Sequence, residues 1–127
     1  MNPKTALIIG AVAASIFGLL LTLAPGPMLN GFGLKGSDEG MVLSRDVGVT
    51  LLGVAVINWM ARNASGAALR GVLAGNLAIQ VLEFLVNGYE LVAGILPSSA
   101  AGGEVIHIVL GAIFLLGLLR ARTTVAV

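Results

Sequence analysis

The chain has 127 residues, which is enough for one domain. Hydrophobic residues make up 57% of it, charged residues only 10%, and the mean hydropathy is +1.03. A soluble domain of this size could not cover so much apolar surface, so the composition predicts an integral membrane protein in a lipid bilayer. The net charge of +1 gives no indication of a nucleic-acid partner, and the lack of cysteine excludes thiolate metal sites, disulfides and thiol catalysis.

Four hydrophobic segments follow one another, each near the roughly 20 residues that a spanning helix needs. The first predicted span covers about 5–24 and ends at Pro25 and Pro27, which cannot continue a helix. A glycine-rich connection up to Gly40 contains several apolar residues and is expected to follow the membrane surface. Short turns separate the other spans, predicted at about 41–61, 68–92 and 104–119. We therefore expect a single transmembrane domain, 1–127, of the all-α class.

Positive charges are distributed unequally between the two sides of these spans. The N-terminus, the second connection and the C-terminus carry Lys4, Arg62, Arg70, Arg120 and Arg122. The first and third connections carry only Lys35. The positive-inside rule then places both termini in the cytoplasm and the first and third connections outside. Because short connections favour antiparallel neighbours, the expected architecture is an up-down-up-down four-helix bundle.

The third span carries a stripe of polar residues. They recur at intervals of four, three, four and three and are Asn76, Gln80, Glu83, Asn87 and Glu90. These intervals place all of them on one face of a helix. Lipid offers such groups no hydrogen bonds, so the stripe is expected to face other helices or a hydrated cavity.

Ionisable residues on the neighbouring spans are predicted to reach the same outer depth as this stripe. Arg45 and Asp46 lie about one turn inside the second span, and Glu104 and His107 begin the fourth. Together with Glu83 they predict a polar pocket open to the cell exterior, because intramembrane ionisable groups are costly and often functional.

The candidate catalytic residues of this pocket are Glu83, Asp46, His107 and Arg45. The two carboxylates and the imidazole would share acid and base roles, while Arg45 would orient a substrate carboxylate or stabilise developing negative charge. The structural alternative is that Arg45 pairs with Asp46 or Glu83 and that the amides only join helices.

The remaining polar and aromatic residues near the pocket are candidate ligand-binding residues. They are Asn76, Gln80, Asn87, Glu90, Trp59 and Asn58. Asn58 lies at an inner depth similar to that of Asn76, which predicts an amide pair. Trp59 also fits an interfacial aromatic belt. Glu104 and His107 have the spacing of half a di-iron site, but a single histidine leaves that set incomplete, so neither a metal nor another cofactor is expected.

Small residues recur at four-residue intervals on two spans. Gly10, Ala14 and Gly18 form such a face on the first span, and Gly71 and Gly75 form another on the third. Both faces permit close helix contact, either within the bundle or between the protomers of a homo-oligomer.

The segments SRDVG at 44–48 and INWMARN at 57–63 resemble small four-helix bacterial membrane proteins of the DoxX-like kind. The proline-containing end of the first span, followed by a Gly/Phe connection, resembles the same group. The likeness in architecture covers the whole chain, although the similar residues are few. The resemblance implies a bacterial inner (plasma) membrane, and it carries over no functional residue.

Three functions are compatible with these features. The first is cofactor-free chemistry on a lipophilic small molecule, such as isomerisation, epoxide opening or cyclisation, because these reactions need proton transfer in a shaped apolar cavity. The second is an accessory or assembly protein whose polar residues only specify packing. The third is a proton-coupled small-molecule transporter that uses Glu83 as its proton site.

Overall fold

The computed structural model describes residues 1–123, and this part of the chain is helical throughout apart from its short connections. The four long helices are α1 (Pro3–Leu23), α3 (Asp38–Ala61), α4 (Gly66–Val92) and α5 (Gly102–Thr123). A short helix, α2 (Pro25–Gly31), follows α1, and a 3-10 turn, η1 (Ser98–Ala101), precedes α5. Residues 1–123 provide four helical segments long and apolar enough to cross a membrane. The expected all-α fold with four such helices is confirmed.

Local sequence signals set the helix ends. The Asn2 side chain accepts a hydrogen bond from the Lys4 backbone nitrogen at 3.0 Å, and the Ser37 hydroxyl accepts one from Gly40 at 3.1 Å. The proline that ends α1 also begins α2, since its fixed φ and missing N–H suit the first turn of a helix. The glycine-rich connection therefore contains a helix that the sequence analysis did not predict.

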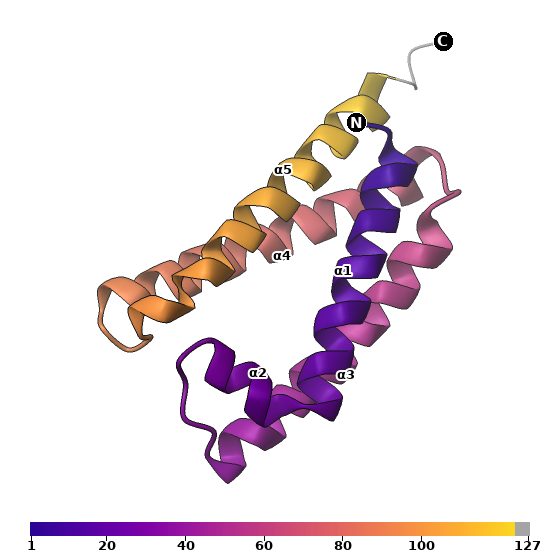
Figure 1. The fold of residues 1–127 in the computed structure, drawn as a ribbon. Helices are drawn as coiled ribbons and strands as arrows, with labels where there is room; N and C mark the ends of the chain where they lie inside the picture. Colours follow the sequence, from indigo (N-terminus) through magenta and orange to yellow (C-terminus); the bar gives the residue numbers. More distant parts are fainter. Residues whose placement is uncertain (124–127) are drawn as a thin grey trace.

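The long helices are arranged as two pairs, α1 beside α3 and α4 beside α5 (Figure 1). Glycine permits the close contact within the first pair. A Cβ atom on Gly48 would lie 2.8 Å from the Thr22 nitrogen and 2.9 Å from the Gly18 carbonyl oxygen. Backbone atoms cannot move aside as a flexible side chain can, so α1 and α3 can approach this closely only with glycine at this position.

The two pairs meet at one end of the molecule and diverge toward the other (Figure 1). The first end, which we call the closed end, holds the start of α1, the end of α5 and the buried core cluster of Ala6, Leu7, Leu73, Phe114, Leu118 and Ala121. At the opposite end, the open end, lie α2 and η1. The structure thus differs from an evenly packed bundle, because the contact between the pairs is concentrated at the closed end.

The outer surface of the helices is largely apolar. Val92 is 92% exposed, Leu23 76% and Met60 74%. Three hydroxyl groups in the described part of the long helices donate to a carbonyl of their own helix: Thr22 to Gly18 at 2.7 Å, Ser44 to Gly40 at 2.8 Å and Thr50 to Asp46 at 2.8 Å. Apolar side chains outside and internally bonded hydroxyls are the pattern that a lipid environment requires.

The two faces of small residues differ in their use within the chain. A Cβ on Gly10 would lie 2.5 Å from the Phe114 ring and 3.0 Å from the Asn58 amide nitrogen, so this face packs tightly. A Cβ on Gly71 or Gly75 would meet nothing within 4 Å. The expected close contact is therefore present along α1, whereas the α4 face makes none within the described chain.

Candidate functional site

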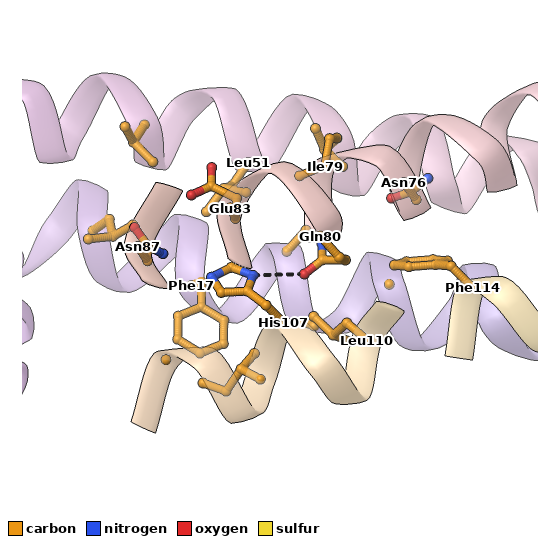
Figure 2. A pocket seen from close by; sticks show the side chains of 18 of the residues that line it. Phe17, Leu51, Asn76, Ile79, Gln80, Glu83, Asn87, His107, Leu110 and Phe114 are labelled. Carbon is orange, nitrogen blue, oxygen red and sulfur yellow. Dashed lines mark hydrogen bonds between the residues drawn. The ribbon is translucent and has the colours of Figure 1, made fainter. Parts of the chain in front are cut away.

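A cavity of about 280 Å³ lies between the two helix pairs, on the open-end side of the core. Ligand pockets in proteins usually measure roughly 300–1,000 Å³, so this one is suited to a small molecule. Figure 2 shows it from close by, with side chains from both pairs directed into it. Its two sides differ in chemistry, since one is apolar and the other carries nearly all of its polar groups.

The apolar wall comes from α1 and α3. On α1 it consists of Ala13, Ala14, Phe17 and Leu21, and on α3 of Val47, Leu51 and Val54. Met28 of α2 and Phe32 extend this wall to the open end. No polar residue marks this side in the sequence, and the sequence analysis did not predict it. The available signal was the spacing of small and aromatic residues along α1, which matches one face of a helix.

The polar wall comes from α4 and α5. It consists of Asn76, Gln80, Glu83 and Asn87 on α4, and His107 on α5. Four of the five residues of the predicted α4 stripe therefore line the cavity. Glu90, the fifth, is half-buried beyond the lining, and its backbone carbonyl accepts hydrogen bonds from Ile95 and Leu96 at the end of α4.

The central contact of the polar wall joins the two helices of the second pair. His107 Nδ1 lies 2.9 Å from Gln80 Oε1, and the imidazole is half-buried. Because an amide oxygen only accepts, Nδ1 donates in this contact, and the neutral form of the ring then has its lone pair on Nε2. In Figure 2 this second ring nitrogen points away from Gln80, toward the side where Asn87 lies. The contact thus orients the ring and favours the tautomer protonated at Nδ1.

Glu83 lines the cavity one turn beyond Gln80 and makes no hydrogen bond or ion pair with the described residues. Its carboxylate is therefore available to whatever enters the cavity. Glu104 lies one turn before His107 and faces α4, where a Cβ on Gly88 would lie 4.0 Å from its Oε2. That oxygen is buried and has no hydrogen-bond partner in the described part of the chain.

The innermost part of the cavity rests on an amide pair. Asn58 donates to Asn76 Oδ1 at 3.0 Å, and Asn76 donates to Asn58 Oδ1 at 2.7 Å and to the Val72 carbonyl at 2.8 Å. The predicted pairing of Asn58 with Asn76 is confirmed. Asn58 is fully buried, so its assignment as a ligand-binding residue does not fit this arrangement. Its amide joins α3 to α4 instead.

Three other predicted site residues lie outside the cavity lining. Arg45 and Asp46 are exposed on α3, and within the described residues Arg45 makes no ion pair with Asp46 or Glu83. Neither the catalytic nor the structural role expected for Arg45 fits this position. Trp59 is 50% exposed, and the Arg62 guanidinium stacks 4.0 Å from its ring centre. This stacking is typical of an interfacial Trp–Arg pair rather than of a ligand site.

The open end of the cavity is bridged by a contact between the two helix pairs. Ser99 in η1 donates a hydrogen bond to the Phe32 carbonyl at 3.1 Å. Gly33, with φ of +76°, lies against the Ser99 hydroxyl, where a side chain would collide. The Phe32 ring also approaches Gly103, whose Cβ would lie 3.9 Å from it. These residues hold the divergent ends of the pairs together.

Comparison with protein families, curated proteins and solved structures finds no match to this chain. Its function has to be inferred from the site itself. Within the described residues, no group of three His, Asp or Glu side chains lies close enough together to share a metal ion. The cavity offers an apolar wall, three amides, a carboxylate without a partner among the described residues and an imidazole oriented by Gln80. Such groups can bind a lipophilic molecule and transfer protons at its polar end.

Proposed function

We propose that this chain is a multi-pass membrane protein that binds a small lipophilic molecule between its helix pairs and transfers a proton at that molecule's polar group. The distribution of positive charge supports placing both termini in the cytoplasm and the open end toward the outer face. The DoxX-like resemblance supports the inner membrane of a bacterium as its location. The protein then presents the cavity to the outer half of the bilayer, where a lipophilic molecule can reach it from the lipid.

The observation that carries this proposal is the hydrogen bond between His107 and Gln80 on the polar wall. A scaffold needs only a satisfied imidazole, whereas this one is half-buried with Nε2 directed along a cavity. A base of this kind, oriented by a neighbour through its other nitrogen, is a recurrent feature of proton-transfer sites. Glu83 supplies the carboxylate that meets the polar group of the bound molecule.

Isomerisation is the reaction class that these groups support best. It needs one base that removes a proton from one atom of the substrate and returns it to another, so no atom is gained or lost. Epoxide opening and cyclisation need a separate acid and base, and they lose support because, with Asp46 outside the lining, the acid would have to be Glu83, which this proposal assigns to binding the polar group of the molecule. Carboxylate substrates lose support as well, because Arg45 is not available to orient them.

Analysis of the molecules bound to the protein tests this function. Wild type and His107→Asn are expressed at equal levels and purified from membranes, and their organic extracts are compared by mass spectrometry. Asparagine keeps an N–H that can donate to Gln80 but has no basic nitrogen. We expect both proteins to retain the same lipophilic molecule class, with the isomerised form present in wild type and absent from the variant.

Two further variants separate binding from chemistry. Ala14→Phe, which places a ring in the cavity, should remove the bound molecule altogether. Val92→Phe, at a side chain that is 92% exposed, is the matched control and should retain the bound molecule. Identical extracts from wild type, His107→Asn and Ala14→Phe would contradict the proposal and favour an accessory or assembly role. Transport of an unchanged molecule into liposomes, lost in Glu83→Gln and retained in His107→Asn, would favour a carrier instead.

The role of Gln80 can be measured without knowing the substrate. His107 is the only histidine in the sequence, so selective ¹⁵N labelling gives one pair of imidazole signals. We expect wild type to show mainly the tautomer protonated at Nδ1, and Gln80→Leu to shift toward the Nε2 tautomer. Gln80→Glu keeps an acceptor at this position and should preserve the Nδ1 form. An unchanged tautomer ratio in Gln80→Leu would show that Gln80 does not position the base.

A further inference from the structure

We infer that the molecule bound in this cavity is a lipophilic amine, whose ammonium group pairs with Glu83. This inference rests on the proposed function, since it requires that the cavity bind a lipophilic molecule. It goes further by assigning the charge of the polar group. The argument depends on the charges around the cavity, on the lack of a partner for Glu83 and on the aromatic rings opposite the polar wall.

The charges around the cavity are acidic. Among the residues that line it, all in the described part of the chain, the ionisable side chains are Glu83 and His107, and none is lysine or arginine. Arg45, the cation expected here, is exposed elsewhere on α3. Arg62 donates to the Trp59 carbonyl and stacks on that residue's ring. A ligand anion would therefore meet a carboxylate without any guanidinium or ammonium group to receive it.

Glu83 needs a partner that the described chain does not supply. It makes no hydrogen bond or ion pair there, and its side chain is exposed at the edge of a cavity whose other wall is apolar, so that in a membrane it faces the cavity and lipid. A carboxylate in such surroundings is costly unless a cation or a hydrogen-bond donor answers it. An ammonium group provides both in one small unit, with its donors directed at the oxygen atoms.

Two neighbouring features favour the same charge. The rings of Phe17 and Phe32 line the cavity, and the negative face of an aromatic ring attracts an ammonium group. Glu104 places a second carboxyl oxygen without a hydrogen-bond partner near the polar wall, one turn from His107. The apolar wall on α1 and α3 would accommodate the hydrocarbon part of the amine, so the two walls of the cavity match its two ends.

Three probes with the same ten-carbon chain test this assignment: decylamine, decanol and decanoate. Each is titrated into the ¹⁵N-histidine-labelled protein in phosphatidylcholine nanodiscs, and the signals of His107 are followed. Because this residue lines the cavity, its signals report binding there rather than partition into lipid. The titrations are repeated with Glu83→Gln. Glu90→Gln, a half-buried glutamate of the same helix outside the lining, is the matched control.

We expect decylamine to give saturable shifts in wild type and Glu90→Gln, with binding weakened about tenfold or more in Glu83→Gln, as loss of a charge-assisted hydrogen bond predicts. Decanol should bind more weakly than decylamine and equally in all three proteins, and decanoate should give no saturable shift. Ala14→Phe and Val54→Phe, two independent ways to fill the cavity, should abolish the shifts.

Different results would contradict the amine assignment and the proposed binding site. If decanol or decanoate binds as tightly as decylamine, or if Glu83→Gln leaves decylamine binding unchanged, the amine assignment is wrong. Shifts that the cavity-filling variants still abolish would leave the proposed lipophilic site intact. If none of the three probes gives a saturable shift in wild type, the proposed binding site is wrong, and the amine assignment falls with it.

Discussion

The closed end and the open end of this molecule are built from the same four helices, but they differ in packing and in how fully their polar groups are hydrogen-bonded. At the closed end, all four helices meet around Phe114 and Leu73, and the amides there satisfy each other. At the open end, the pairs diverge around a cavity, and Glu83 and Glu104 have carboxyl oxygens without partners in the described chain. The hydrogen bond from Ser99 to the Phe32 carbonyl bridges the pairs there.

This difference separates the residues that maintain the fold from those that are available to a ligand. A polar group whose atoms are already hydrogen-bonded within the protein has little left to offer a ligand, as for Asn58 and Asn76, which bond to each other through both nitrogen and oxygen. An unsatisfied group in an apolar setting is destabilising unless something binds to it. Substitutions at the closed end should therefore change stability, and those at the open end should change binding with little effect on stability.

The largest effect is expected for Phe114→Ala at the closed end. Phe114 is 1% exposed and packs against Gly10 of α1. Its truncation should lower the free energy of unfolding by about 3–5 kcal/mol, the usual cost of removing a buried ring. Unfolding in mixed micelles with increasing SDS measures this change. Phe84→Ala, where the ring is 40% exposed, is the matched control and should cost much less. Equal losses in both variants would contradict a core centred on the closed end.

An intermediate effect is expected for Asn58→Leu, because it leaves the Asn76 amide without its partner on α3. We expect a loss of about 1–2 kcal/mol in the free energy of unfolding, within the range measured for hydrogen bonds between membrane helices. The double variant Asn58→Leu/Asn76→Leu should recover part of this loss, since no amide is then left unpaired. A double variant that is as unstable as the sum of the single ones would show that the amides do not act as a pair.

The sequence predicted the polar wall better than the rest of the site, for a physical reason. Polar residues in an apolar span are conspicuous, and their helical spacing alone places Asn76, Gln80, Glu83 and Asn87 on one face. Arg45 and Asp46 were assigned to the pocket from their depth in the membrane alone, which follows from their position along the span. Rotation about the helix axis decides whether a residue faces the cavity, and it depends on which neighbour the helix packs against.

The arrangement of the two helix pairs illustrates what the spacing of residues in the sequence cannot provide. The cavity exists because α1 and α3 pack closely through Gly18 and Gly48 and then diverge from α4 and α5. Such a divergence results from contacts between distant segments, and no local pattern encodes it. The bridge between Ser99 and Phe32 is equally long-range, since 67 residues separate its partners. The four-helix fold was therefore predictable, whereas the apolar wall and the bridge were not.

The smallest effect on stability is expected for Ser99→Ala, which removes the hydrogen bond to the Phe32 carbonyl. The loss should be about 0.5–1 kcal/mol, because the bond lies at an exposed site. The spacing of the open end should nevertheless change. Since the chain has no cysteine, spin labels at Asn30→Cys and Ala101→Cys, both exposed, report the distance between α2 and η1. Ser99→Ala should broaden this distance distribution toward longer values, and the adjacent exposed Ser98→Ala should leave it unchanged. If both distributions match wild type, the bridge does not hold the open end together, and packing of Phe32 against Gly103 is sufficient to do so.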